Sequence, residues 1–174
     1  MSNLETYIKT IPDFPKPGIM FRDVTSVLDD AEGFQIAINE LEKLLEGVDV
    51  DLIAGVESRG FIFGAPLAFN MKKAFIPIRK KGKLPRKTIE ESYDLEYGQA
   101  TIEIHDDAVK PGQKVVLLDD LLATGGTLEA AAKLIERLGG EVVKVVSLIE
   151  LVDLKGREKL SKYDVGSIVQ YEGE

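Results

Sequence analysis

The chain of 174 residues is 44% hydrophobic and 30% charged, which is the composition of a folded protein, and we expect one domain over residues 1–174. It contains no cysteine, which excludes disulfides, thiolate metal ligands and cysteine nucleophiles. A net charge of −8 argues against a nucleic-acid partner, because that binding depends on neutralising phosphates.

The first half of the chain predicts a helix followed by two strands that flank a second helix. After a proline-rich opening, Phe34, Ile38 and Leu41 recur at helical spacing within residues 33–46. The next expected elements are a buried strand at 52–56, a turn at 57–60, an apolar helix to about 71 and a strand at 74–78.

Residues 79–99 interrupt this alternation, because they are polar and show no clear period. We expect an exposed, mobile loop or ribbon here. Residues 79–87 hold six of the 22 basic residues and no acidic residue. Such a run is usually a solvated face. Its position after a strand favours a flexible flap, at about 79–99, over a merely solvated face. Such a flap would bind a small and highly charged anion.

The second half predicts four more strands and a helix. The expected order is a strand at 100–104, a central strand at 115–118, a helix at 128–138 stopped by Gly139 and Gly140, and strands at 142–149 and 164–169. His105, after the first of these strands, is expected on a solvated turn. The alternation of strands and helices predicts an α/β fold with a doubly wound, mostly parallel sheet flanked by helices.

The sequence shows no membrane or export segment. No apolar run approaches the roughly 18 residues that a membrane span requires, and the first residues do not have the pattern of a signal peptide. We therefore expect a cytoplasmic protein with no membrane partner.

The strongest chemical signal is the string VVLLDDLLATGGT at residues 115–127. Ligands of open α/β sheets lie beyond the carboxyl ends of the strands, and here a buried strand brings Asp119 and Asp120 to that edge. A loop with glycines and threonines then opens into a helix, whose first N–H groups can bind phosphate. The acids can accept hydrogen bonds from a diol or lie near a hydrated Mg²⁺. The string therefore predicts a site for a phosphorylated sugar.

A second glycine-containing segment, GVESRG at residues 55–60, has the glycine spacing of a nucleoside-triphosphate P-loop. That loop requires Lys and then Ser or Thr at the next two positions, where this chain has Phe61 and Ile62. A P-loop is therefore excluded, and residues 57–60 remain a turn after a buried strand.

Residues 115–127 resemble the phosphoribosyl pyrophosphate signature of the type I phosphoribosyltransferases. Similarity to the adenine-specific members of this family extends from about Ile11 to Tyr171. It rests on several separate strings in family order: PDFP at 12–15, Gly18 with FRD at 21–23, SRGF at 58–61, GKLP at 82–85, LEYG at 95–98, the signature itself, and LKGR at 154–157.

This resemblance implies a role for each group of site residues. Asp119 and Asp120 would hold the ribose hydroxyls. The 5-phosphate would be bound by Ala123, Thr124, Gly125, Gly126 and Thr127. The pyrophosphate would be bound by Glu57, Ser58, Arg59 and Gly60, together with Arg79, Lys80 and Lys83 of the flap. A small N-terminal hood, at about 11–28, would bind adenine with Met20, Phe21 and the backbone at Arg22.

Catalysis in the family implies three further residues and a cofactor. Glu96 would exchange a proton with the purine, Tyr97 would help to close the site, and Arg59 would stabilise the departing pyrophosphate. Mg²⁺ would arrive with the substrate and lie near Asp119 and Asp120, with no direct protein ligand. The resemblance also implies a homodimer, with flap residues reaching across the interface.

Two other functions stay open at this point. The first is transfer to a 6-oxopurine such as hypoxanthine, guanine or xanthine. Enzymes of that type place a lysine near the base oxygen, and neither Lys144 nor Lys155 clearly qualifies. The second is a regulator that senses phosphoribosyl pyrophosphate without catalysis, which is expected to carry a basic element for nucleic acid.

Overall fold

The computed structural model describes residues 3–95 and 97–173. Its strands are β1 (Lys9–Pro12), β2 (Met20–Asp23), β3 (Leu52–Val56), β4 (Ala74–Lys80), β5 (Thr88–Asp94), β6 (Gln99–His105), β7 (Lys114–Leu122), β8 (Glu141–Leu151) and β9 (Val165–Tyr171). Its helices are α1 (Thr25–Leu28), α2 (Ala31–Leu44), α3 (Arg59–Asn70), α4 (Gly126–Arg137) and α5 (Gly156–Lys159), with short 3-10 helices η1 (Leu4–Tyr7) and η2 (Val152–Leu154).

Seven strands form the central sheet in the order β5-β6-β4-β3-β7-β8-β9. The five strands from β4 to β9 in this order are mutually parallel, and the β5–β6 hairpin adds to β4 in antiparallel fashion. After β3 the chain moves outward to β4, and β7 then returns to the other side of β3 before the chain continues to β8 and β9. The order therefore reverses between β3 and β7, where open α/β sheets bind their ligands.

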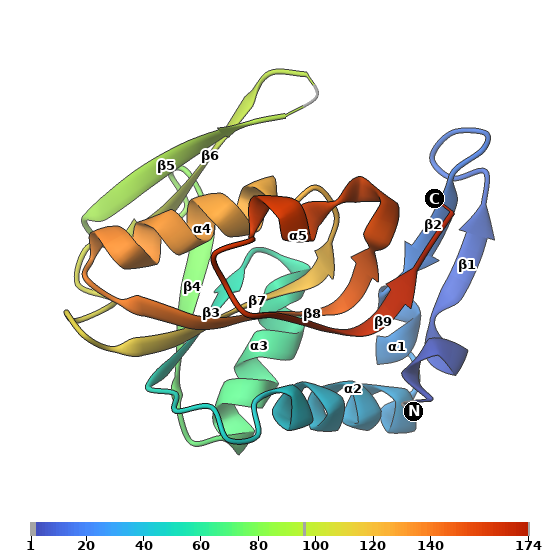
Figure 1. Ribbon diagram of the computed structural model, residues 1–174, viewed down its shortest axis with the longest axis horizontal. Coiled ribbons are helices and arrows are strands. Elements are labelled where there is room, and N and C mark those ends of the chain that lie inside the picture. The colour runs from blue at the N-terminus through green and yellow to red at the C-terminus, as the bar shows by residue number, and fades with distance from the viewer. Residues whose placement is uncertain (1–2, 96, 174) are drawn as a thin grey trace.

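Helices cover both faces of the sheet, with α4 and α5 on one side and α2 and α3 on the other (Figure 1). Ile38 and Leu41 of α2 and Phe63 and Leu67 of α3 pack in the core on their side, as the helical spacing predicts. Asp30 caps α2 by accepting hydrogen bonds from two N–H groups of its first turn. The predicted α/β fold, with a mostly parallel sheet flanked by helices, is confirmed.

The segment at 79–99 was expected to form a loop or a ribbon. The structure contains a β-hairpin here, which is the ribbon. Arg79 and Lys80 complete β4, residues 88–94 form β5, and Gln99 begins β6. Register pairs run from Thr88 with His105 to Asp94 with Gln99. The hairpin lies over α4 and extends beyond the body of the protein (Figure 1).

The solvated turn expected at His105 is wrong. His105 is the last residue of β6 and is buried, and its Nδ1 lies 3.0 Å from a guanidinium nitrogen of Arg86. Because Arg only donates hydrogen bonds, Nδ1 of His105 is the acceptor in this contact.

A small antiparallel sheet of β1 and β2 lies near the C-terminal strand β9 (Figure 1). Its turn is closed by Asp13, whose carboxylate accepts a hydrogen bond from the N–H of Gly18 at 2.7 Å. Ser26 of α1 ties the start of β1 to the end of β2 through Lys9 and Asp23. In the described part of the chain, no helix is long and apolar enough to cross a membrane.

Candidate active site

The predicted site residues come together at the point where the strand order reverses. The turn that follows β3 contributes Glu57, Ser58 and Arg59, and β7 contributes Asp119 and Asp120. These residues line one cavity with four others, Val56, Lys80, Tyr93 and Ile102, and with Thr127 from the start of α4. Elements far apart in the sequence therefore supply one site because parallel strands end at the same edge of the sheet.

The two acids lie within β7, which continues to Leu122. The carboxylate of Asp119 accepts a hydrogen bond from the N–H of Asp120 at 2.8 Å, and the carboxylate of Asp120 accepts one from Nε of Arg59 at 2.5 Å. Burial raises the pKa of the Asp119 carboxyl well above its ordinary value, and the charge of Asp120 raises it further. A diol or a cation that approaches this pair would relieve that cost.

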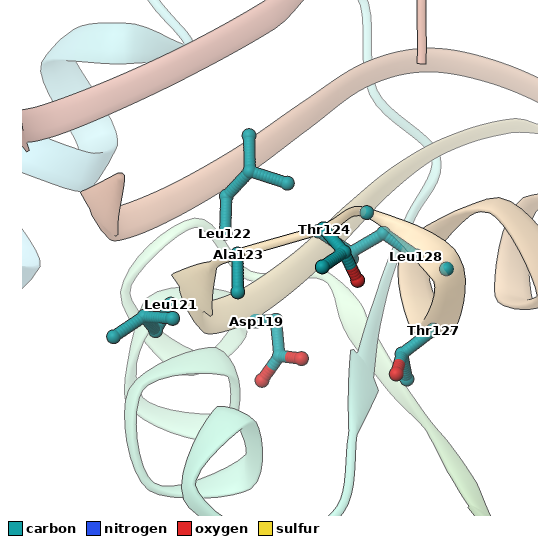
Figure 2. Close-up of a pocket in the computed structure, with 9 residues that line it drawn as sticks. Asp119, Leu121, Leu122, Ala123, Thr124, Thr127 and Leu128 are labelled. Carbon is teal, nitrogen blue, oxygen red and sulfur yellow. The ribbon is translucent and has the colours of Figure 1, made fainter. Parts of the chain in front are cut away.

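The loop after β7 has the geometry of a phosphate cradle. Gly125 adopts φ +82, in the left-handed region that favours glycine, and α4 begins at the next residue. Since Gly125 provides no side-chain cap, the first N–H groups of α4 remain available to a ligand. Figure 2 shows the residues that line this hollow, from Asp119 through Ala123 and Thr124 to Thr127.

The predicted pyrophosphate loop is tied to the end of β4. The carboxylate of Glu57 accepts hydrogen bonds from the guanidinium of Arg79, at 3.1 and 3.3 Å, and from the N–H of Lys80. Gly60 lies so close to β7 that an added Cβ would be 3.1 Å from a carboxylate oxygen of Asp119. The Glu57–Ser58 peptide bond is cis. The loop and the basic end of β4 therefore form one unit beside the acids.

The hood residues lie next to this loop. Phe21 and Arg22 line a small hollow together with Arg59 and Leu121. Met20 is exposed, and Phe21 makes an edge-to-face contact with Phe14 at 5.1 Å between ring centroids. The guanidinium of Arg22 lies 4.0 Å from the centre of the Tyr171 ring, and it also donates to Thr10. Phe21 is thus half-buried beside the site, and Met20 precedes it in the chain and is exposed.

Comparisons with known proteins agree with this geometry. Residues 24–172 match the family model described as the phosphoribosyl transferase domain. The adenine phosphoribosyltransferase of Butyrivibrio fibrisolvens is 68% identical over 99% of this chain and 96% of its own length. The crystal structure of adenine phosphoribosyltransferase from Thermoanaerobacter pseudethanolicus superposes with a TM-score of 0.93 at 54% identity, covering 97% of this chain and 98% of that one.

The chain belongs to the adenine phosphoribosyltransferase family. The resemblance inferred from the sequence is therefore confirmed. A further family structure, from Saccharomyces cerevisiae, is a complex with D-2,5-dideoxy-2,5-imino-altritol 1,6-bisphosphate and adenine. It has a TM-score of 0.89 and 37% identity, and the match covers 95% of this chain and 96% of that one.

Of the two residues expected on the LEYG string, Tyr97 is the one that lies in the described part of the chain, and the structure leaves it outside the site. Tyr97 is 85% exposed, at the tip of the β5–β6 hairpin. Glu96 falls outside the described residues. The hairpin instead contributes Tyr93, whose hydroxyl accepts a hydrogen bond from Thr127 at 3.0 Å and whose ring lines the cavity. Sequence reasoning missed Tyr93, although its place two residues before the family's LEYG string is a usable signal.

A buried acid, Glu103 of β6, shapes the turn that carries Lys83. It is 3% exposed, and one of its oxygens accepts hydrogen bonds from the N–H groups of Lys83 and Leu84 at 3.0 and 2.8 Å. Burial alone would raise the pKa of Glu103, but these backbone hydrogen bonds lower it overall. Glu103 therefore fixes the backbone of the basic turn that the family uses.

A second buried acid supports the back of the phosphate cradle. Glu150 of β8 is 3% exposed and accepts hydrogen bonds from Nε and Nη2 of Arg157, both at 2.7 Å. Gly156 precedes that arginine and packs on the carbonyl of Ala123 and on Leu122. The family string at 154–157 is thus a support for the loop that follows β7.

Proposed function

We propose that this chain transfers a 5-phosphoribosyl group from phosphoribosyl pyrophosphate to adenine, forming AMP and pyrophosphate. The observation that carries the proposal is the acid pair of β7 beside an uncapped helix start, facing the turn after β3. That arrangement offers acceptors for a diol and donors for a phosphate in neighbouring parts of one site. Membership of the family and the adenine-bound yeast relative support the choice of base.

The site residues take the following roles in this proposal. The ribose hydroxyls bind Asp119 and Asp120, and the 5-phosphate binds residues 123–127. The pyrophosphate binds residues 57–60 together with Arg79, Lys80 and Lys83. The base binds beside Met20, Phe21 and Arg22, at the edge of the hollow that also contains Arg59.

In the reaction, N9 of adenine attacks C1 of the ribose, and the bond from C1 to the pyrophosphate oxygen breaks with its electrons leaving on pyrophosphate. The anomeric carbon inverts. The proton at N7 of the base passes to Glu96, which the family resemblance puts in this role. Most of the acceleration comes from orientation and from cations placed where the negative charge develops.

Arg59 has to change partner during this cycle. Its guanidinium is paired with Asp120, and more than half of its side chain is exposed. The hydrogen bond that Arg59 donates to Asp120 raises the pKa of Arg59, so the side chain remains a cation throughout. When ribose hydroxyls occupy Asp120, the guanidinium is released toward the adjacent pyrophosphate position. Substrate binding thus places the positive charge where the leaving group needs it.

Mg²⁺ fits the donor set of this site. In proteins it binds through one or two carboxylates plus substrate phosphates. Burial and the charge of Asp120 raise the pKa of Asp119, so a cation near this carboxyl would stabilise its charged form. Across residues 3–95 and 97–173, no group of three or more His, Asp or Glu side chains converges on a metal site. Bound with the substrate, Mg²⁺ would neutralise charge on the pyrophosphate.

We also propose that the chain acts as a homodimer through the outer face of α3. Ile62, Ala65 and Phe69 are exposed on that helix at a spacing that places them on one side, and Phe69 is 83% exposed. The same helix begins at Arg59, so an interface there is continuous with the site. Sedimentation should give a dimer, and Phe69→Lys should shift it toward monomer. A wild-type monomer would refute this proposal.

One assay tests the proposed activity. AMP formation should require adenine, phosphoribosyl pyrophosphate and Mg²⁺, and hypoxanthine, guanine and xanthine should react far more slowly. Asp120→Asn should lose activity by about 100-fold or more, because a hydrogen-bond acceptor for the ribose is lost with a charge. Asp49→Asn is the matched control, since Asp49 is an exposed acid at the opposite edge of the sheet, paired with Lys114. A preference for an oxopurine would refute the choice of base.

The cytoplasmic location stays a prediction from the sequence. Cell fractionation with an antibody to the chain tests it.

A further inference from the structure

The phosphate cradle opens on its outer side into a second cavity. Residues from the β5–β6 hairpin, from the cradle and from α5 line it, namely Tyr93, Asp94, Leu95, Thr124, Gly126, Thr127 and Lys159. Lys159 is the basic residue among them and comes from the last position of α5. A cation from another element therefore faces the loop that the family uses for the 5-phosphate.

The ammonium group of Lys159 lies close to the start of α4. A Cβ added at Gly126 would be 3.9 Å from Nζ of Lys159. Gly126 is the first residue of α4, so its N–H is one of the groups that the helix leaves without an intrahelical partner. The lysine and the helix start thus offer a positive charge and N–H donors to the same space.

The helix that carries Lys159 is held against the cradle from behind. An added Cβ at Gly125 would lie 2.8 Å from the carbonyl oxygen of Gly156, so the two backbones are in close contact. Arg157 anchors the same turn through Glu150 and through the carbonyl of Val165 at 2.6 Å. The position of Lys159 relative to the cradle is therefore fixed at its backbone, and only its side chain has to move.

Lys159 is available to a ligand, unlike the basic residues around it. Arg157 pairs with Glu150, Lys162 with Glu136, and Lys155 approaches Glu158 at 4.0 Å. Lys159 makes no ion pair with any residue in the described ranges. The acid in the same cavity, Asp94, accepts a hydrogen bond from Gln99 at 3.3 Å.

We infer that Lys159 binds the 5-phosphate of the ribose and sets the affinity of the site for phosphorylated ligands. The inference rests on the proposed function, because it names a further ligand of the same site. A phosphate dianion in the cradle receives N–H donors from α4, and Lys159 supplies the full positive charge that those donors lack. The ligand class is therefore the ribose 5-phosphate monoester, as in AMP or phosphoribosyl pyrophosphate.

The test compares two ligands that differ only by this phosphate. Affinities for AMP and for adenosine are measured by calorimetry on the wild type and on Lys159→Met, Lys159→Arg and Lys162→Met. Lys162→Met is the matched control, because it removes the same charge from a neighbouring lysine that is already paired with Glu136. Lys159→Met should weaken AMP binding about tenfold, as expected for a charge-assisted hydrogen bond, and leave adenosine binding unchanged.

The remaining outcomes are equally specific. Lys159→Arg should stay within about threefold of the wild type for AMP, since the positive charge is retained. Wild-type affinity for AMP in Lys159→Met would overturn the inference, and so would an equal loss for adenosine. A wild type that forms AMP while Lys159→Met binds it normally refutes only the role of Lys159. A wild type that neither forms nor binds AMP refutes the proposed function itself.

Discussion

Adding one methyl group at Gly156 should displace the loop that forms the phosphate cradle. In Gly156→Ala the new Cβ would collide with the carbonyl oxygen of Ala123 and lie 2.6 Å from Cδ1 of Leu122, whereas ordinary contact begins at 3.4 Å. Leu122 is buried and Ala123 belongs to the phosphate cradle, so neither neighbour yields without moving the loop. The φ angle of Gly156 is outside the left-handed region, so an alanine here would cause no backbone strain and the collision alone would destabilise the protein.

The size of the effect follows from that collision. Overpacking of a buried position costs about 1–3 kcal/mol, which for a chain of this length corresponds to a fall of roughly 2–12 °C in Tm. A displacement of the cradle that approaches 1 Å should also lower kcat/KM for phosphoribosyl pyrophosphate by roughly 10- to 100-fold. The two readouts are linked because the same loop bears the strain and binds the substrate.

The assay combines thermal unfolding with initial rates of AMP formation. Gly166→Ala serves as the control, because its added Cβ would meet mainly the flexible end of Lys144, at 3.3 Å. We expect Gly166→Ala to remain near the wild type in both measurements. If Gly156→Ala matched the wild type in Tm and in kcat/KM, the support that we assign to this turn would be refuted.

Three further predictions concern groups around the cradle and the basic turn. Tyr93→Phe removes the acceptor that orients Thr127 and should raise the KM for phosphoribosyl pyrophosphate about three- to tenfold, with Tm unchanged; an unaltered KM contradicts this role. Glu103→Gln should destabilise the protein at pH 7 by about 1–3 kcal/mol. Because folding lowers the pKa of Glu103, its carboxylate stabilises the protein above pH 4.5, and this stabilisation is lost as the pH falls further. The Tm values of the wild type and Glu103→Gln should therefore converge in acid. A constant difference in Tm would contradict this role. Arg157→Met should lower the free energy of unfolding by about 2 kcal/mol, because the buried Glu150 loses its charged partner. An unchanged midpoint in chemical denaturation would contradict this stabilising role.

The sequence predicts the central elements well because their side chains are apolar on both faces. Residues 52–56 and 115–118 are buried throughout, and each forms part of an inner strand. The end of β7 was harder to place, since the apolar run stops at Asp119 while the ladder to β8 continues as far as Leu122. Backbone pairing does not require apolar side chains, so the strand extends past the hydrophobic signal.

Strand β5, at 88–94, was not predicted, because an acidic residue occupies one of its inward-facing positions. Ile89 and Tyr93 pack toward α4, and Glu91 between them also faces inward but pairs with Arg137 of that helix at 3.2 Å. An acid in the middle of an alternating pattern obscures the period of two that identifies a strand. Tyr93 lies on the same face of β5 as Glu91, beside Thr127 of the cradle. Because the strand was not predicted, this site residue was missed with it.

The buried acids Glu103 and Glu150 could not be assigned from the sequence for a related reason. Each lies in a strand pattern among apolar residues, and its partners come from other parts of the fold than its own strand. The residues that contact substrate in the family were recognised because they lie together in short strings. The groups that hold those strings in place depend on tertiary contacts.

The most direct test of the central claim is a crystal structure of the chain with AMP bound. We expect the ribose hydroxyls within hydrogen-bond distance of the carboxylates of Asp119 and Asp120, and the phosphate at the N–H groups of residues 124–127. AMP bound elsewhere, or with its phosphate away from the start of α4, would contradict the account.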